Sequence, residues 1–345
     1  NGSGKTSVLE AIHILGMARS FRGASIKSLI SHKCDSCTVY GLASTSSLSG
    51  SSQALGVCRE RSGASQIKVA GKAVRSVAQL VEHLPLQVIN SDGFDLLTGP
   101  PNARRQFLNW GVFHVEQRFF GEWQRFQRCI KQRNVVLRRG KMSSQLSIWT
   151  KDLAKSGETI NSYRMDYVGQ LVPRFQSIVN LLMPYMAQRL ELRYRQGWDR
   201  AVDYAQALET SLPSDQEQGY THVGPQRADL RVFIDGHLAS DTLSRGQQKL
   251  VVTALKLAQG QLMAETTRGS CTYLVDDLPS ELDSTHCKRV CEILSSMSAQ
   301  VFVSCIELED IESMWPDSEI LGMFHVEQGV ISRTEKERPS AATAV

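Results

Sequence analysis

The sequence predicts an α/β protein in which one α/β lobe carries an inserted, largely helical lobe. Three observations lead to this expectation. The chain begins with a Gly/Ser-rich loop that opens a helical pattern, and an apolar strand near residue 275 ends in two adjacent carboxylates. Between them, the residues that follow Gly99 show helical periodicity with few turn signals over most of residues 100–215. At 345 residues, the chain is long enough for two lobes.

The opening loop, NGSGKTS, matches the second half of the phosphate-binding pattern G-x-x-x-x-G-K-[ST]. The pattern places its first glycine two positions before Asn1, so we expect the natural chain to extend beyond that residue. Gly2 and Gly4 allow a tight turn whose N–H groups point at a phosphate. Lys5 can reach the β- and γ-phosphates, and the Thr6 hydroxyl can ligate Mg²⁺.

Apolar residues follow the loop at helical spacing, at Val8, Leu9, Ile12 and Leu15. The loop therefore opens a helix whose positive N-terminus faces the anion. A flexible tail before an ordinary helix is the alternative interpretation.

Residues 36–75 change character and predict an antiparallel meander beside the nucleotide core. Short β-like runs at 38–43, 53–57 and 66–69 are separated by Ser/Gly-rich turns. A further strand is expected over 84–90, followed by a short helical stretch. The Gly-Pro-Pro sequence at 99–101 then marks a boundary.

The first part of the helical region is strongly basic. Residues 101–141 contain ten basic and two acidic side chains, a net charge of +8 in a chain whose total is +4. Most of the interleaved aromatics are expected in the core, but the arginines cannot all be buried. A solvated face and a DNA-phosphate contact both remain open, and the imbalance favours the contact. The candidate DNA-binding residues are Arg104, Arg105, Arg125, Arg128 and Arg133.

A second helical pattern is expected over 146–194, a polar loop over 213–218 and a disordered tail over 335–345. The predicted division is therefore a nucleotide-binding lobe over 1–99 and 216–334, a helical lobe over 100–215, and the tail.

The composition describes an ordinary globular protein, with 41% hydrophobic and 21% charged residues. No run of about 18 uncharged apolar residues occurs, so no membrane span is expected. The eight cysteines are scattered, and the lone pair Cys34 and Cys37 lacks a second pair at zinc spacing. Free thiols fit a reducing compartment, so we expect a cytoplasmic protein.

A second candidate anion site lies at residues 243–249, which read LSRGQQK. Ser244 is a good N-cap for the helical pattern that follows. A capped helix start with Gly246 and Gln247 presents a hydroxyl, backbone N–H groups and the positive end of the helix dipole. Taken alone, this could be any capped helix.

The apolar strand Cys271–Val275 ends in Asp276 and Asp277, about one helix after that turn. Carboxylates at a strand end suit Mg²⁺ beside a triphosphate. Asp276 would hold the metal directly or through water, and Asp277 would orient or deprotonate the attacking water. Another buried strand is expected at 300–304, with its end near the γ-phosphate.

These motifs together resemble the ATP-binding-cassette (ABC-type) ATPases, and the finer match is to the RecF family of bacterial recombination mediators. The resemblance covers nearly the whole chain and rests on residues 1–7, Arg19–Arg22, Arg104–Leu108, Gly224–Leu230, Leu243–Gln247, Asp276–Asp277, Ser280–Asp283 and Met323–Glu327. The chain departs from the family pattern at Gln226, where histidine is usual, and at Asn109, where aspartate is usual.

The resemblance implies an ABC-type ATPase lobe with an antiparallel β subdomain, and two ATP molecules sandwiched between two subunits. One chain would bind ATP through Asn1, Gly2, Ser3, Gly4, Lys5, Thr6 and Ser7, and the partner would close the site with Ser244, Gly246 and Gln247. Thr6 and Asp276 would hold Mg²⁺, and Lys5, Asp276 and Asp277 would carry catalysis.

By the same resemblance, ATP would drive homodimerisation on single-stranded DNA and on junctions of single- and double-stranded DNA. Slow, DNA-stimulated hydrolysis would act as a switch without chemistry on the DNA. The expected partners are RecR and RecO, with RecA loaded indirectly, in gap repair, replication and SOS induction.

Two other classes of P-loop protein fit the sequence less well. ATPases of the chromosome-organising or double-strand-break class need a coiled-coil arm of hundreds of residues, and the helical insert is far too short. A small-molecule kinase that does not act on DNA could use the phosphate loop, but it would not need the motif at 244–247.

Overall fold

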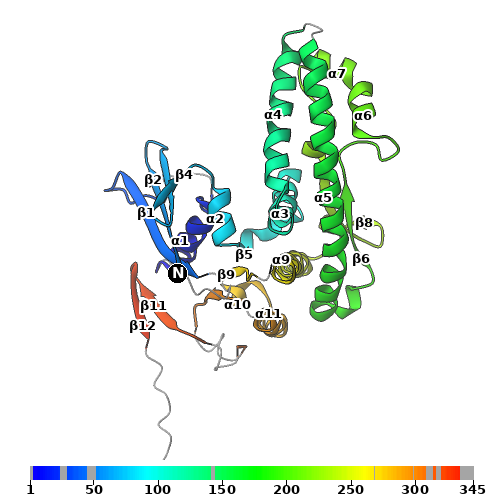
Figure 1. Ribbon diagram of the computed structural model, residues 1–345. Helices are drawn as coiled ribbons and strands as arrows, with labels where there is room; N and C mark the ends of the chain where they lie inside the picture. The colour runs from blue at the N-terminus through cyan, green and yellow to red at the C-terminus, as the bar shows by residue number, and fades with distance from the viewer. Residues whose placement is uncertain are drawn as a thin grey trace, which may run out of the picture. The chain divides into compact units, whose positions relative to one another are not determined.

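The computed structural model describes residues 3–23, 29–44, 52–140, 144–267, 269–297, 299–307, 314–315 and 320–334. The chain forms two compact units (Figure 1). The first combines Asn1–Asp92 with Gly269–Val345, and the second is Gly93–Arg268. The first boundary lies near the predicted one at 99. The second differs from the predicted return at 216, because the strand and the long helix that precede residue 269 pack against helices of the second unit.

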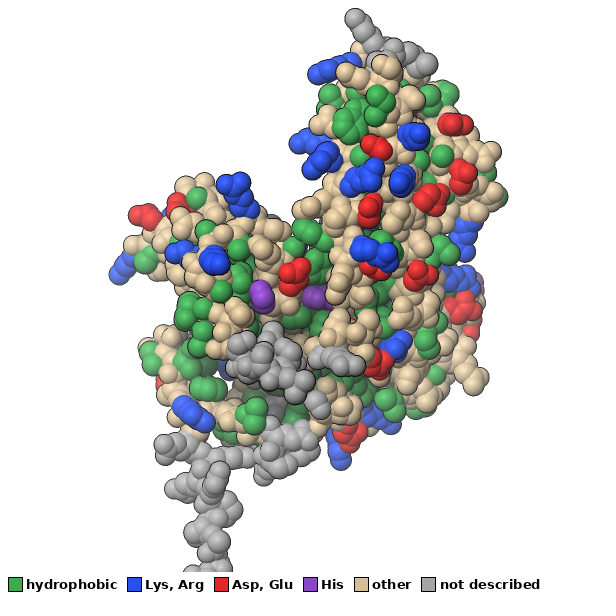
Figure 2. Space-filling model, in the orientation of Figure 1, with side chains coloured by type: hydrophobic (Ala, Val, Ile, Leu, Met, Phe, Trp, Pro, Cys, Tyr) green, Lys and Arg blue, Asp and Glu red, His purple; other side chains and the backbone are tan. Residues whose placement is uncertain are grey.

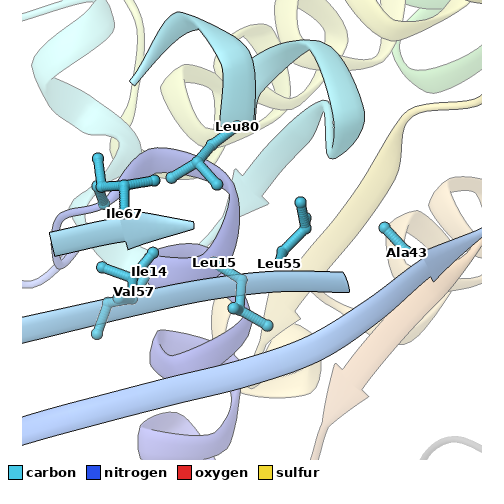
Figure 3. Packing of buried hydrophobic residues seen from close by; sticks show 8 residues of the cluster. Ile14, Leu15, Ala43, Leu55, Val57, Ile67 and Leu80 are labelled. Atoms are coloured by element: carbon cyan, nitrogen blue, oxygen red, sulfur yellow. The ribbon is translucent and has the colours of Figure 1, made fainter. Parts of the chain in front are cut away.

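The first unit contains the predicted antiparallel meander, in the order β1-β2-β3-β4. Its strands are β1 (Ser36–Ser44), β2 (Ser52–Glu60), β3 (Ser65–Val69) and β4 (Lys72–Val74). Helix α1 (Lys5–Met17) packs on this sheet, and Ile14 and Leu15 meet Leu55, Val57 and Ile67 in one hydrophobic cluster (Figure 3). The end of the phosphate-loop helix is therefore anchored by the meander.

A three-stranded parallel sheet of order β10-β9-β5 forms the centre of the first unit. Its strands are β5 (Leu86–Ile89), β9 (Thr272–Asp276) and β10 (Val301–Ser304). The central strand β9 is an unbroken apolar run because both of its faces are covered, and Tyr273, Leu274 and Val275 are at most 1% exposed. Leu9 of α1 packs on Leu274 and Leu86, so α1 lies against this sheet.

The remaining elements of the first unit are short. They are α2 (Ala78–His83), α10 (Leu278–Glu281), α11 (Ser284–Ser296), and the antiparallel hairpin β11 (Met323–Glu327) and β12 (Val330–Thr334). The 3-10 turn η2 (Ser91–Leu96) spans the point in the chain where the first unit ends and the second begins. Asp283 caps α11 by accepting a hydrogen bond from His286 N.

The second unit is built on α5, which packs against α4 and α9 (Figure 1). The helices of this unit are α3 (Pro101–Val115), α4 (Phe119–Arg138), α5 (Ser144–Leu182), α6 (Tyr204–Thr210), α7 (Leu212–Gln218), α8 (Ala239–Thr242) and α9 (Arg245–Thr267). Two 3-10 turns, η3 (Pro184–Met186) and η4 (Pro225–Arg227), connect them to an antiparallel sheet of β6 (Leu190–Arg195), β7 (Asp229–Ile234) and β8 (His237–Leu238).

Two predictions in this unit are wrong. Residues 190–195 form strand β6 rather than the end of a helix, because Leu190, Leu192 and Tyr194 alternate with charged residues at period 2 and pair with β7. Residues 212–218 form helix α7 rather than a loop, because Pro213 lies in the first turn, where a missing N–H costs nothing.

The expected tail at 335–345 lies outside the described residues, and so do Asn1 and Gly2. Among the helices that the structure describes, none combines the length and apolarity needed to cross a membrane.

Candidate nucleotide-binding site

The carboxyl ends of β9 and β10 meet the start of α1 around the Asp276 carboxylate. Asp276 Oδ1 accepts a hydrogen bond from Thr6 Oγ1 at 3.1 Å and another from Ser304 Oγ at 2.6 Å. The register of the parallel strands places Ser304 beside Asp276. The sequence-predicted pair Thr6 and Asp276 is thus brought together across 270 residues of chain. Hydroxyl and carboxylate oxygens are the ligands that Mg²⁺ prefers, so these residues fit that ion.

The loop before α1 leaves backbone donors unused by the helix. Gly4 caps α1 with φ 110°, a left-handed conformation that favours glycine. The first bond of the helix turn runs from Val8 N to Gly4 O, at 3.2 Å. The N–H groups of Lys5, Thr6 and Ser7 therefore have no acceptor within α1, and together with the helix dipole they form an anion site.

The turn between β11 and β12, near the C-terminal end of the described chain, contacts this loop. Gly329 N donates to Ser3 O at 3.0 Å, and a side chain at Gly4 would meet Val326 and Gly329 at 3.5 Å. The C-terminal hairpin therefore supports the phosphate loop within the first unit.

Asp277 follows the strand in an unusual backbone conformation. Its φ of 54° and ψ of 53° are left-handed, which costs a non-glycine residue about 1 kcal/mol. This conformational cost is offset by two hydrogen bonds that Asp277 N donates, to Ser304 O and to Ser304 Oγ, both at 3.1 Å. Among the described residues, its carboxylate accepts no hydrogen bond, so the side chain remains available to a water molecule. Strain at a carboxylate held in this way is typical of functional positions.

Ser304 is the residue that the sequence reasoning did not select. Its strand was expected near the γ-phosphate, but its side chain was not assigned a role. The available signal was its position as the last residue of the strand that follows the acidic strand. Through its hydroxyl, Ser304 joins Asp276 and the backbone of Asp277.

The second unit carries the predicted motif at the start of α9. Ser244 Oγ accepts from Gln247 N at 3.4 Å, and Gln247 Oε1 accepts from Ser244 N at 3.0 Å. This reciprocal pair is a capping box and confirms Ser244 as the N-cap. Ser244 and Gly246 are exposed, and a side chain added at Gly246 would meet nothing within 4 Å. The motif thus presents an open helix start to solvent.

Two of the predicted DNA-binding arginines are instead part of the core, and this prediction is corrected. Arg133 is 0% exposed and donates to Asp215 at 2.7 Å. Arg104 is 7% exposed and donates to Asp229 at 2.7 and 3.1 Å. Burial by itself raises the pKa of Asp229, but bonds from Arg104 and Arg231 outweigh it and hold that pKa below its usual value. Neither guanidinium can reach a phosphate without breaking a buried ion pair.

The other three candidates are accessible. Arg125 forms an ion pair with Asp152 at 3.2 Å, while Arg128 pairs with no carboxylate in the described part of the chain. Arg105 lies near the N-terminus of α3, is half-buried, and donates a hydrogen bond to Ala228 O at 3.2 Å. Lysine and arginine side chains are spread over the face of the helical unit seen in Figure 2, with acidic side chains between them.

Within the described residues, no cluster of three or more His, Cys, Asp or Glu side chains could hold a metal ion by itself. Cys34 and Cys37 are free thiols. The geometry that fits a cation is therefore the Thr6–Asp276 pair, which would be completed by phosphate oxygens.

Comparison with known proteins covers nearly the whole chain. The family model described as RecF/RecN/SMC N terminal domain matches residues 1–332. Proteins named DNA replication and repair protein RecF are 47% identical over 339 residues in Pseudomonas fluorescens and 49% identical over 335 residues in Azotobacter vinelandii. These alignments cover 98% and 97% of this chain, and 91% and 90% of the two relatives.

Solved structures show the same fold. The recombination mediator protein RecF with ATP, of the RecFOR pathway, matches with a TM-score of 0.82 at 23% identity, over 97% of this chain and 90% of that one. An Smc head domain from Pyrococcus furiosus, solved bound to the C-terminal domain of ScpA, matches with a TM-score of 0.52 at 14% identity, over 97% of this chain and 87% of that one. The fold is thus the ABC-type ATPase fold of RecF and SMC heads. With nearly half of its residues identical to RecF proteins over almost its whole length, the chain belongs to the RecF family of DNA replication and repair proteins.

Proposed function

We propose that this chain is an ATP-dependent DNA-binding switch that acts in recombinational gap repair and replication. The observation that carries the proposal is the bond between Thr6 and Asp276 beside the unused N–H groups of α1. This arrangement offers donors to phosphates and oxygen ligands to a cation at one point. The names of the relatives support ATP and DNA repair as its setting.

Each residue of the site has a role that follows from its chemistry. The backbone N–H groups after Gly4 and the Lys5 ammonium hold the β- and γ-phosphates. Thr6 and Asp276 position Mg²⁺, which when bound neutralises phosphate charge. Asp277 accepts a hydrogen bond from the attacking water and orients it. Ser304 keeps Asp276 and Asp277 in place. Hydrolysis is slow and is stimulated by DNA, and it resets the switch.

The open start of α9 supports closure of the nucleotide site by a second copy of the chain. Ser244 and Gly246 are exposed, and the absence of a side chain at Gly246 allows close backbone approach by an anion. In the proposed dimer, Ser244, Gly246 and Gln247 of one copy contact the ATP held by Lys5 and Thr6 of the other.

The solved RecF–ATP structure is described as part of the RecFOR pathway, and this supports RecR and RecO as partners. The proposed consequence is the loading of RecA on single-stranded DNA. We extend the proposal to junctions of single- and double-stranded DNA, to SOS induction, and to a cytoplasmic location. Arg125 and Arg128 on α4 are proposed to contact DNA phosphates.

The test is sedimentation of a full-length protein that carries this chain, with and without ATP-Mg²⁺ and gapped DNA. The expected result is a monomer that becomes a DNA-bound dimer only with ATP. A protein that binds ATP yet ignores both DNA and a second copy would overturn the proposal and favour a kinase acting on a small molecule.

A further inference from the structure

A basic pocket lies wholly within the second unit, and none of the residues that line it was assigned to the nucleotide site. Its volume is about 650 Å³, and it is lined by Pro101, Arg105, Arg195, Gly197, His222, Arg227, Asp229 and Arg231. The lining comes from the start of α3, the edge of the β6–β7 sheet and the loop at 222–228. Of these residues, Arg105 alone was predicted from the sequence to bind DNA.

The wall of the pocket is built by close backbone contact. Gly197 has φ 101°, and its carbonyl accepts from Gly224 N at 3.1 Å. A side chain at Gly197 would lie 2.2 Å from Gly224 O, so only glycine fits there. The fully buried Arg164 donates to Pro225 O at 2.7 Å and holds the same loop from behind. The positions of the backbone at Arg227 and Asp229 are therefore fixed before any ligand arrives.

The positive charge of the pocket is not balanced by the protein. Its one carboxylate, Asp229, is already shared between Arg104 and Arg231. Arg105, Arg195 and Arg227 pair with no carboxylate in the parts of the chain that the structure describes. Burial lowers the pKa of Arg105, and the charges of Arg227 and Arg104 lower it further against the pull of Asp229.

The neighbouring sheet does not neutralise the remaining charge. Arg193 on β6 stands opposite Arg231 on β7, but Arg193 pairs with Glu191 and Arg231 with Asp229. Arg195 stands opposite Asp229, whose carboxylate is already bonded to Arg104 and Arg231. The charge left without a paired carboxylate among the described residues of the pocket is therefore that of Arg105, Arg195 and Arg227.

An exposed aromatic ring borders the pocket. The Arg227 guanidinium lies 5.9 Å from the Tyr220 ring centroid, and the His222 ring lies 4.1 Å from it. Tyr220 is 38% exposed. A charged pocket beside an exposed aromatic ring is the combination that binds single-stranded nucleic acid, with phosphates in the pocket and a base on the ring.

The geometry points to a binding site for the backbone phosphates of single-stranded DNA, formed by Arg105, Arg195 and Arg227, with an unpaired base stacked on Tyr220. This inference rests on the proposed function, because it assumes that the chain binds DNA. It adds a site for single-stranded DNA, formed by other residues than the proposed DNA-contacting arginines of α4.

The first experiment removes charge from the two exposed arginines. The double variant Arg195→Gln with Arg227→Gln is titrated with a fluorescent oligo-dT by anisotropy over a series of salt concentrations, in the full-length protein with ATP. We expect affinity to fall at least tenfold and the salt slope to shrink by about 1.4, because two phosphate contacts of single-stranded DNA are lost. The matched control is Arg189→Gln, an exposed arginine that immediately precedes β6 and pairs with Asp235. The control should change neither quantity.

The second experiment separates stacking from charge. Tyr220→Ala should weaken oligo-dT binding about tenfold at an unchanged salt slope, whereas Tyr220→Phe should bind like the parent protein. Thermal melting checks that each variant folds.

The outcomes distinguish this inference from the proposed function. If the parent protein binds ATP but no DNA, the proposed function fails. If the parent binds DNA and the double arginine variant binds it equally well with the same slope, the pocket is not the site and the proposed function stands. A loss confined to oligonucleotides with a 5′-phosphate would also overturn the backbone assignment, in favour of an end-binding site. ATP affinity should stay unchanged throughout, and a parallel loss of ATP binding would contradict a DNA-specific pocket.

Discussion

Arginine serves opposite purposes within a few residues of this chain. Arg133 is enclosed in a network with Asp215, Thr221 and Thr150, whereas Arg128, five residues earlier on the same helix, is exposed. From residue type and local charge, the sequence predicted that both arginines bind DNA phosphates. Helical phase decides the difference, because positions 126, 129, 133 and 136 form the buried stripe of α4.

The first prediction concerns the buried pair. Arg133→Met should lower the free energy of unfolding by about 3–5 kcal/mol, because Asp215 would remain buried without its guanidinium. Urea denaturation of the variant measures this. Arg128→Met is the control and should stay within about 0.5 kcal/mol of the parent. Adding Asp215→Asn to Arg133→Met should recover part of the lost free energy of unfolding. No recovery would argue against the unpaired buried charge of Asp215 as the cause.

The second prediction concerns Lys5. Lys5→Ala should reduce ATP affinity about tenfold to a hundredfold, because a charge-assisted contact to the phosphates is lost. A fluorescent nucleotide titration measures this, with the exposed Lys33→Ala as control. Unchanged nucleotide affinity would contradict the assignment of the loop.

The third prediction concerns acid stability. Burial lowers the pKa of His114 to about 4, and its Nε2 is enclosed without a hydrogen-bond partner in the described residues. The unfolded chain, with a pKa near 6.5, binds the proton more readily, so stability is fully present above pH ~6.5 and is lost as the pH falls toward 4.

For this third prediction, the parent should lose about 2 kcal/mol more stability than His114→Phe between pH 7.5 and pH 5. Urea unfolding of both proteins at the two pH values gives the comparison. Equal losses would mean that His114 is protonated in the folded protein.

At the scale of elements, helix α9 begins with a self-contained capping box. Ser244 and Gln247 satisfy each other's backbone groups, so this helix start needs no partner to fold. Nothing in the described structure requires glycine at 246, because a side chain there would lie in open space. Gly246 is therefore free for the contact with a second copy that we propose.

The fourth prediction follows from that contrast. Gly246→Ala should raise the stability of the protein by about 0.5 kcal/mol yet weaken ATP-dependent dimerisation. Ser244→Arg should cost about 1 kcal/mol through loss of the cap, retain ATP binding, and fail to dimerise. Thermal melting and sedimentation with ATP measure both quantities. Normal ATP-dependent dimers from Ser244→Arg would refute closure of the site by the partner subunit.

At the scale of the whole molecule, the first unit is assembled from two segments that are far apart in the sequence, whereas the second is one continuous segment. The first unit joins residues 1–92 to residues beyond 269, and its nucleotide site needs both parts. The net charge of +8 over residues 101–141 overstates the available surface charge, because Arg104 and Arg133 are neutralised inside.

The fifth prediction concerns the remaining basic surface on α4. Replacing Arg125 and Arg128 by Glu should weaken DNA binding and flatten its salt dependence, because phosphate contacts release fewer counterions. Anisotropy titrations over a salt series test this, with the double variant Lys33→Glu and Lys288→Glu, two exposed lysines of the first unit, as a charge-matched control. Unchanged binding would make the α4 surface a solvated face.

Local chemistry determined much of this protein from the sequence alone. The phosphate loop, the acidic strand end, the meander and the Ser244 cap depend on residues close together in the chain, where spacing and turn chemistry act directly. The family followed from those motifs, and the comparisons confirm it.

Tertiary structure decided what local patterns leave open. Residues 190–195 became a strand because β7 pairs with them, and Ser304 joined the site because parallel register sets it beside Asp276. Likewise, burial turned Arg104 and Arg133 into core ion pairs, while close packing of Gly197 on Gly224 shaped the basic pocket. These outcomes depend on contacts between residues distant in sequence, whose energies outweigh local preference.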